Sequence, residues 1–284
     1  MRFRAKIDHV LTFSRIVQTV EKLAKQCVIR WSPDSLQIIC PGGENEGGVQ
    51  VWSGRGPLQK SLFSDYKIES GSNNEINMEV ATEPLYQALR SAQSSPDVII
   101  KLAKKDDHAV LNFDVQAVSQ QGKTIQVTHD VRINVIRLSE VEKLQEPQCP
   151  EPDVHIILPP LAKLRTVTDH MRPLSTLLGV SANRAGGFSL KIQTEEVAVE
   201  TVWSGCDVPK ITYDDEEGVQ ADPEEWHHAI VSVKSFLQFL SSYVVSTTTI
   251  ACICQDHCLI MYVYIGEVED HGGVLTFYIP ARNP

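Results

Sequence analysis

Apolar and polar residues alternate along most of this 284-residue chain, which is typical of half-buried β-strands. Helical periodicity replaces the alternation in four places. Residues 9–25, 82–92, 160–171 and 234–244 each repeat apolar side chains every three or four positions, so each predicted helix has one apolar face. The order strand, helix, several strands, short helix and further strands occurs twice. This predicts an α+β protein with two halves of the same kind.

Clusters of Gly, Asn, Pro and Ser separate the predicted strands from one another. In the first half, strands are predicted at 1–7, 27–31, 36–40, 49–53, 63–68, 76–80, 98–102, 109–114 and 124–136. In the second half, they are predicted at 154–158, 177–183, 188–193, 197–204, 228–233, 248–254, 259–265 and 274–279. The most economical packing places both helices of a half on one sheet face, with their polar sides outward.

A short motif supports an internal duplication. Val-Trp-Ser-Gly begins at Val51 and again at Val202, 151 positions later, in a chain with only four tryptophans. At the same offset Leu85 corresponds to Phe236, and the apolar run at 99–102 corresponds to that at 250–253. The alternative is a chance alignment of two β-rich halves.

The length suits two domains of about 140 residues. Glutamates and prolines interrupt the pattern at 137–152, which predicts an exposed connector. We therefore expect one repeat at 1–136, the connector at 137–152 and a second repeat at 153–284. The acidic segment 207–225 is predicted to be a loop without an assigned role.

Composition restricts the protein's surroundings. The seven cysteines, an odd number, and the absence of an Asn-x-Ser/Thr site favour a reducing compartment. No run of 18 apolar residues occurs, and the N-terminal residues lack the apolar segment of a signal peptide. The formal net charge is −10, so any contact with DNA must depend on locally concentrated cations.

Such cations occur on the predicted outward sides of the four helices, although Glu21, Glu83 and Asp169 lie among them. The candidates for DNA-facing residues are Arg15, Lys22, Lys25, Arg90, Lys163, Arg165, Arg172 and Lys234. The alternative is an ordinary solvated helix face.

Motifs of enzymes and metal sites are weak. Residues 54–61 approach a phosphate-binding loop, but Gln59 replaces its second glycine and no helical pattern is seen after it. The cluster Cys252, Cys254, His257 and Cys258 has no second cysteine pair, so buried free thiols are the simpler interpretation. His227, His228 and the 106–108 segment come with no nucleophile motif. We expect no enzyme, metal or cofactor.

The duplicated unit with two helices per half and a long connector resembles the eukaryotic sliding clamps, such as proliferating cell nuclear antigen. Local sequence is similar to one branch, the Hus-one type subunit of the nine-one-one DNA-damage checkpoint clamp. The matching segments are Met1–Ile7, Ala88–Ala92, Leu102–Asp106, Pro150–Pro159, Ala251–His257, Leu259–Ile265 and Gly273–Ile279.

The resemblance implies a DNA-clamp fold and a non-catalytic subunit of a heterotrimeric ring around double-stranded DNA. Two related but distinct clamp subunits complete such a ring. An ATP-dependent clamp loader places it at DNA damage, and it recruits checkpoint and repair proteins in the nucleus. The alternatives are a homotrimeric replicative-type clamp and a β-rich interaction scaffold without DNA contact.

The resemblance also implies site residues. Subunits of this family pair through outer strands, here expected at 125–135 and 197–204. The candidate interface residues are Ile125, Val127, Val131, Ile133, Val197, Val199, Thr201 and Trp203. A partner-peptide pocket beside the connector would use Ile136, Leu138, Val141 and Leu144, which could instead only hold the connector down.

Overall fold

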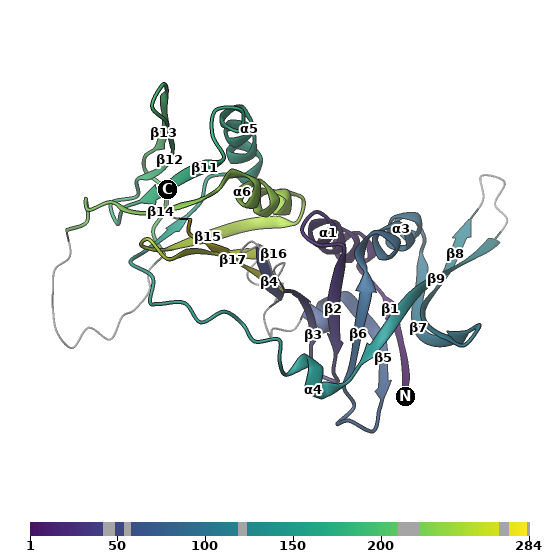
Figure 1. Cartoon of the computed structure of the whole chain (residues 1–284). Coiled ribbons are helices and arrows are strands. Elements are labelled where there is room, and N and C mark those ends of the chain that lie inside the picture. The colour runs from purple at the N-terminus through teal and green to yellow at the C-terminus, as the bar shows by residue number, and fades with distance from the viewer. Residues whose placement is uncertain (42–48, 54–57, 119–123, 210–221, 267–272, 283–284) are drawn as a thin grey trace. The chain divides into compact units, whose positions relative to one another are not determined.

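The computed structural model describes residues 1–41, 49–53, 58–118, 124–209, 222–266 and 273–282 (Figure 1). The fold is α+β and divides into two units. The first unit contains Met1–Pro41 and Val51–Glu146, and the second contains Pro147–Tyr264 and Leu275–Pro284. The acidic segment predicted at 207–225 lies largely outside the described residues.

The first unit is built on one antiparallel sheet in the order β4-β3-β2-β6-β9-β8-β7-β1-β5. Its strands are β1 Arg2–Ile7, β2 Gln26–Trp31, β3 Leu36–Cys40, β4 Gln50–Ser53, β5 Phe63–Glu69, β6 Ile76–Ala81, β7 Asp97–Lys105, β8 His108–Val118 and β9 Thr124–Ile136. Strand β9 pairs with β8 along its first part and with β6 along its last four residues. This long strand therefore joins two groups of strands into one sheet.

Helices α1, Val10–Glu21, and α3, Thr82–Ala92, lie side by side in the first unit (Figure 1). The apolar stripe predicted for α1 is buried, with Phe13 and Ile16 inaccessible to solvent. The Thr82 hydroxyl donates to the Ala24 carbonyl at 2.7 Å, and Gln93 Nε2 donates to Ser14 Oγ at 2.8 Å. Ala81 is the N-cap of α3, while the Thr82 side chain fastens the start of α3 to the residues that follow α1.

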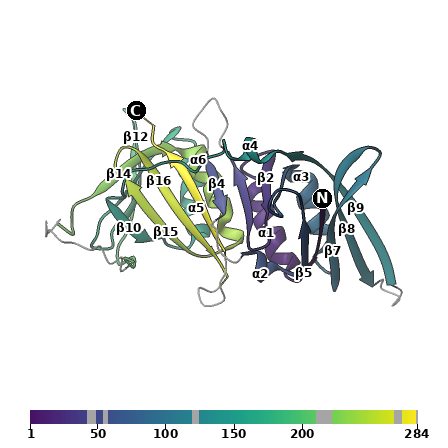
Figure 2. The ribbon, with the colours of Figure 1, turned by 90° about the horizontal axis from the view of Figure 1, so that it is seen from below.

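The second unit contains two antiparallel sheets, in the orders β13-β12-β11-β14 and β10-β15-β16-β17. Figure 2 shows β15 and β16 of the second sheet side by side. The strands are β10 Val154–Ile157, β11 Leu177–Ala182, β12 Phe188–Gln193, β13 Ala198–Trp203, β14 His227–Ser232, β15 Ser246–Cys254, β16 Cys258–Ile265 and β17 Val274–Pro280. Its helices are α5, Leu161–Met171, and α6, Val233–Leu240, followed by the 3₁₀ turn η1, Ser241–Val244.

Each unit has an aromatic core beneath its helices. In the first, the tilted rings of Phe3 and Trp31 pack with centroids 4.4 Å apart, and Phe13 packs edge-on against Phe63. In the second, Phe239 packs edge-on against Phe277 at 5.3 Å. Burying each such ring contributes about 1.5–3 kcal/mol, so each unit has a core of its own.

The predicted repeat is present in the order of elements. Helix α5 begins at Leu161, 151 positions after the first residue of α1, and β11 begins at Leu177, 151 positions after the first residue of β2. The same offset separates Thr82 and Val233, the first residues of α3 and α6. The structure thus confirms a twofold repeated unit with two helices in each copy.

The motif that suggested the repeat is not equivalent in the two sheets. Trp52 lies opposite Ile39, which lies opposite Val28. The corresponding row in the second unit is Gly179, Lys191 and Glu200. Trp203 instead lies opposite Phe188 and packs on its ring at 5.6 Å. The two tryptophans therefore occupy different rows of the repeated sheet.

Two short elements were not predicted. Helix α2, Leu58–Leu62, precedes β5, although no helix was expected after the phosphate-loop-like segment. Helix α4, Leu138–Val141, forms one turn inside the predicted connector. Both are too short to show a helical period in sequence. None of the described helices is long and apolar enough to cross a membrane.

Candidate functional sites: helix cations, strand edges and connector

The candidate cations of the first unit lie on the solvent side of the α1–α3 pair. Arg15 on α1 and Arg90 on α3 are exposed, as are Lys22 and Lys25 just beyond the end of α1. Lys22 forms an ion pair with Glu21 at 2.9 Å, whereas no ion pair of the other three is found within the described part of the chain. The helices bury their apolar sides, which leaves these cations facing water.

In the second unit, Lys163 on α5, Lys234 on α6 and Arg172 at the end of α5 are exposed. Arg165 is half-buried, since its guanidinium lies 5.4 Å from the centre of the Tyr243 ring and 3.8 Å from the Asp169 carboxylate. Thr168 is buried in the apolar stripe of α5, and its hydroxyl donates to the Leu164 carbonyl. Lys22 and Arg165 are therefore partly compensated locally, whereas the other six cations form no ion pair with any residue that the structure describes.

The two predicted interface strands differ in character. Strand β13 is the last strand of its sheet, so one of its edges has no partner strand among the described residues. Val197 and Val202 beside that edge are 39% and 56% exposed. The other predicted positions on β13, Val199, Thr201 and Trp203, are half-buried. An exposed edge with apolar neighbours can pair with another strand.

Strand β9 is only partly an edge. Its first part pairs with β8 alone, and there Ile125 and Val127 are 46% and 37% exposed. Val131 and Ile133 are 3% and 4% exposed because they face the core of the first unit. Within this chain Val131 and Ile133 therefore contribute to the core, and the interface assigned to β9 stays a prediction that depends on its backbone edge and on Ile125 and Val127.

The connector is attached to the outer face of the first sheet. Val141 in α4 is 2% exposed and packs in one cluster with Val28 of β2 and Ile39 of β3. Trp52, Ile136 and Leu144 pack around that cluster, whereas Leu138 is half-buried and takes no part in it. A hollow of about 270 Å³ remains beside it, lined by residues that include Arg30, Trp52 and Leu144.

The cysteine-rich end of β15 lies in a buried cluster. Cys252, Cys254 and Cys258 are buried free thiols that pack with Ile260. Burial raises the pKa of Cys252 to about 12, so it stays protonated near neutral pH. No cluster of three or more metal-ligating side chains is found in the described ranges.

The other weak motifs are also accounted for. His227 Nδ1 contacts Gln255 Oε1 at 3.1 Å, and His228 lies 3.4 Å from the Asp256 carboxylate on the surface. Asp106 and Asp107 form the tip of the β7–β8 hairpin, both with positive φ, as in the turns that favour such residues. Gln59 of the phosphate-loop-like segment is buried, while residues 54–57 lie outside the described part.

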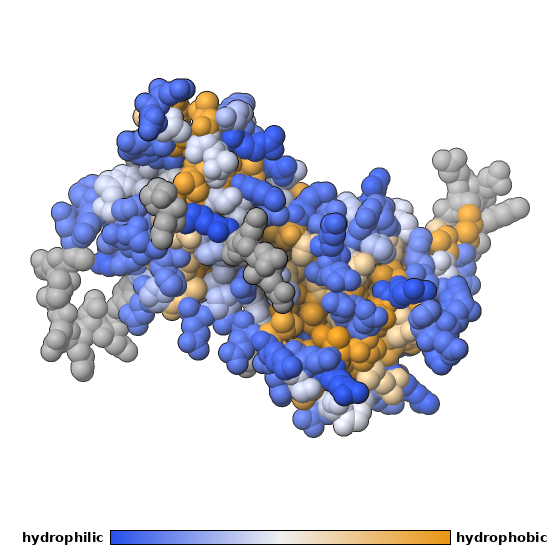
Figure 3. Space-filling view, viewed as in Figure 1, coloured by the Kyte–Doolittle hydropathy of each residue, from blue (hydrophilic) through white to orange (hydrophobic). Residues whose placement is uncertain are grey.

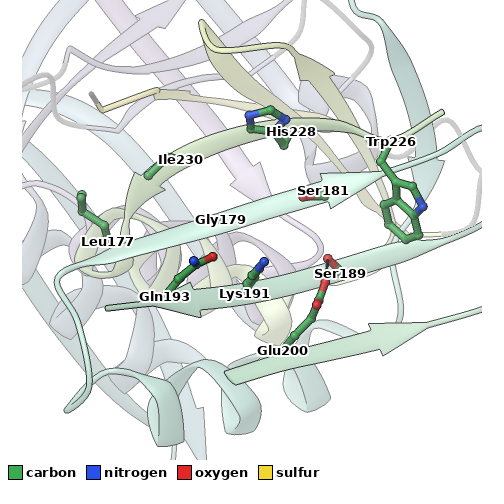
Figure 4. A pocket seen from close by; sticks show the side chains of 10 residues that line it. All are labelled: Leu177, Gly179, Ser181, Ser189, Lys191, Gln193, Glu200, Trp226, His228 and Ile230. Carbon is green, nitrogen blue, oxygen red and sulfur yellow. Dashed lines mark hydrogen bonds between the residues drawn. The ribbon is translucent and has the colours of Figure 1, made fainter. Parts of the chain in front are cut away.

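A larger hollow, not foreseen from sequence, lies on the outer face of β11–β14. It measures about 510 Å³ and is bordered by strand residues together with Trp226, which precedes β14. Figure 4 shows Trp226 at one end of this hollow. In the sequence, the one hint of this hollow is Trp226, a large apolar residue next to an acidic segment. In the structure its side chain is 42% exposed.

Two repeated units, each with a helix pair on antiparallel strands, define the sliding-clamp class of protein. The chain superimposes on a proliferating cell nuclear antigen from Entamoeba histolytica with a TM-score of 0.70 over 99% of both chains, at 16% identity. The family model described as Hus1-like protein matches residues 1–283. The chain therefore belongs to the Hus1-like family.

Similar proteins support that assignment. The chain is 34% identical to the checkpoint protein hus1 of Schizosaccharomyces pombe over 98% of each chain. It is also 34% identical to the checkpoint protein HUS1 of Homo sapiens over 99% of each chain. The chain is accordingly a checkpoint sliding-clamp subunit, whose expected associates are other clamp subunits and DNA.

Proposed function

We propose that this chain is a non-catalytic third of a heterotrimeric ring that encircles double-stranded DNA. In this proposal an ATP-dependent loader places the ring at DNA damage in the nucleus, and the ring recruits checkpoint and repair proteins. The observation that carries the proposal is the set of exposed cations on both helix pairs of a chain with a net charge of −10. A closed ring is held by topology, so a weak and sequence-independent attraction to phosphates is sufficient.

The proposed subunit contacts use backbone edges. The exposed start of β9, around Ile125 and Val127, would pair with the equivalent of β13 on one neighbour. The free edge of β13, beside Val197 and Val202, would pair with the equivalent of β9 on the other. Head-to-tail pairing of this kind closes a ring when the rotation between subunits allows it.

The connector supports a further part of the proposal. The hollow beside Val141 and Leu144 would accept an apolar side chain from a partner peptide. Val141 itself already packs on the sheet, so we assign it to holding the connector and assign the exposed part of Leu144 and Trp52 to the peptide.

Charge reversal on the helices tests the DNA contact. We expect a variant with Arg15, Lys22, Arg90 and Lys163 all changed to Glu to assemble with partner subunits normally. After loading, it should be retained on closed circular DNA about tenfold less at low salt, with a shallower dependence of retention on salt concentration. The measurement is the fraction bound after gel filtration over a salt series.

The matched control changes Arg2, Lys60, Lys67 and Lys143, four exposed cations away from the helix pairs, to Glu. It alters net charge equally and should retain the wild-type behaviour. Equal loss in both variants would show that only net charge matters, and no loss in either would remove these helices from the DNA contact. Purified chain that forms a trimer by itself would contradict the heteromeric ring.

A further inference from the structure

The outer face of the four-stranded sheet in the second unit is shaped to receive a side chain. The floor of the 510 Å³ hollow consists of the small residues Gly179, Ser181 and Ser189 on β11 and β12. Figure 4 shows these positions between the longer side chains that border them. Three small residues grouped on the outer face of a sheet leave space that a neighbouring side chain would otherwise fill.

Apolar side chains stand at both ends of this hollow. Leu177 and Ile230 border one end, and the Trp226 ring borders the other (Figure 4). The ring is held closely, because a Cβ atom at Gly187 would lie only 2.7 Å from the Trp226 Cη2 atom. Trp226 is therefore a preformed aromatic wall, although 42% of it is exposed.

Two charges lie between these apolar ends. Lys191 and Glu200 face each other on β12 and β13, and both side chains are exposed. Glu200 accepts a hydrogen bond from the Ser189 hydroxyl at 3.2 Å. Neither charge forms an ion pair within the described part of the chain, and His228, the remaining titratable group of the lining, lies beside Asp256. Both charges are thus available to a ligand.

The first unit shows what such a face can hold. There the equivalent row, Val28, Ile39 and Trp52, is covered by the connector, whose Val141 is 2% exposed. In the second unit, the hollow is lined only by β11–β14 and Trp226, without a covering segment among the described residues. In the first unit, this sheet face therefore binds a short segment of the chain, the connector, through the apolar side chain of Val141.

We propose that the hollow above Gly179 binds a short peptide segment of a partner protein. An aromatic side chain of that segment lies over Gly179 against Trp226, and a neighbouring basic residue pairs with Glu200. An aromatic ring fits the size of the hollow and can stack on the indole of Trp226. The basic residue can form an ion pair with the Glu200 carboxylate. The inference extends the proposed recruiting role of the clamp to a second surface, away from the connector.

Selection of peptides on the full-length chain tests this proposal. The probe is a display library of random twelve-residue peptides, followed by fluorescence anisotropy of the enriched peptides made synthetically. Enriched sequences should place an aromatic residue near an Arg or Lys. Binding should weaken about tenfold or more in Gly179→Leu, which fills the hollow. Gly179 lies in an extended strand and a Cβ there meets its nearest atom at 3.4 Å, so the variant is expected to fold.

Two further variants sharpen the test. Ala103→Leu adds the same side chain to a strand of the first unit and should bind the peptides as the wild type does. Glu200→Gln should weaken only peptides that contain the basic residue, by about threefold to tenfold. Circular dichroism and unfolding midpoints confirm that each variant is folded.

Three results would overturn the proposal: no enriched peptide, enriched peptides without an aromatic residue, or equal binding to Gly179→Leu. Self-association of the chain that Gly179→Leu abolishes would instead assign the surface to a second copy. These measurements need neither the ring nor DNA. A failure of the hollow to bind peptides can therefore be separated from a failure of the clamp function.

Discussion

The outer faces of the two repeated sheets occupy the same place in each unit but differ in chemistry. In the first unit, the row Val28, Ile39 and Trp52 is apolar and lies under the connector. In the second unit, the same row is Gly179, Lys191 and Glu200, and it borders an open hollow. A repeated backbone therefore does not fix what covers it. The residues of one row decide whether the chain covers that face itself or leaves it to a partner.

Figure 3 shows one face of each unit, coloured by hydropathy. In Figure 3, apolar surface is concentrated on the first unit, while most of the visible surface of the second unit is hydrophilic. Exchanging the chemistry of the two rows should accordingly have unequal costs.

The largest effect on stability is expected when a charged side chain replaces an apolar one in the covered row Val28, Ile39 and Trp52. Ile39→Lys places an ammonium group at a position that is 2% exposed, and it should lower the free energy of unfolding by about 3 kcal/mol. The reverse change in the second unit, Lys191→Ile, affects an exposed strand position and should change stability by less than about 0.5 kcal/mol. Urea unfolding followed by circular dichroism measures both. Similar costs for the two variants would show that the rows are equally covered.

A smaller effect is expected for loosening the connector. Val141→Ala removes two methyl groups from the cluster with Val28 and Ile39 and should cost about 2 kcal/mol. Glu142→Ala changes the next residue, which is exposed, and is expected to stay within about 0.5 kcal/mol of the wild type. Proteolysis within residues 142–148 should also accelerate in Val141→Ala only. If it does not, the connector is held elsewhere.

The smallest effect is expected for the pH dependence of stability at two equivalent positions, Arg4 and His155. His155 on β10 faces Cys252, whereas Arg4 on β1 faces Lys101 at the equivalent place in the first unit. Burial, assisted by the positive charge of Arg184, lowers the pKa of His155 below its usual value of 6.5. The unfolded chain then binds this proton more readily, so stability falls as pH decreases from about 7 through 6.5 toward the lowered pKa.

His155→Gln should flatten this acid-side loss, and Arg4→Gln should leave it unchanged, because an arginine does not titrate in this range. Unfolding midpoints at pH 7.5, 6.5 and 5.5 compare the three proteins. An unchanged slope in His155→Gln would assign the loss to other groups.

Much of the fold could be predicted from periodicity. The bounds of β9 and β12 match the prediction, because strict alternation between turn residues marks both ends of a strand. The five-residue α2 and the single turn α4 were missed, since one apolar pair within a single turn is too short to establish a helical period.

The sites could be predicted less completely. Exposure of Arg15, Arg90, Lys163 and Lys234 follows from the polar side of an amphipathic helix, which sequence shows directly. The burial of Val131 and Ile133 did not follow, because alternation places them on the same face of β9 as the exposed Ile125 and Val127 and does not reveal where along the strand that face meets the core. The hollow of the second unit was invisible for a related reason. Its floor is assembled across strands, and strand pairing cannot be read from spacing along the chain.

The hairpins that follow the first helix of each unit have one more consequence. Four residues, Ser32–Ser35, join β2 to β3, whereas five, Asn183–Gly187, join β11 to β12. Equivalent residues of β3 and β12 are thus related by 152 positions, as Ile39 and Lys191 are, and not by 151. A chimaera that swaps these hairpins must be cut inside the turns. If both cuts were placed 151 positions apart, the strand after the turn would be shifted by one residue. Its inward side chains would then face water, because successive side chains of a strand point to opposite faces.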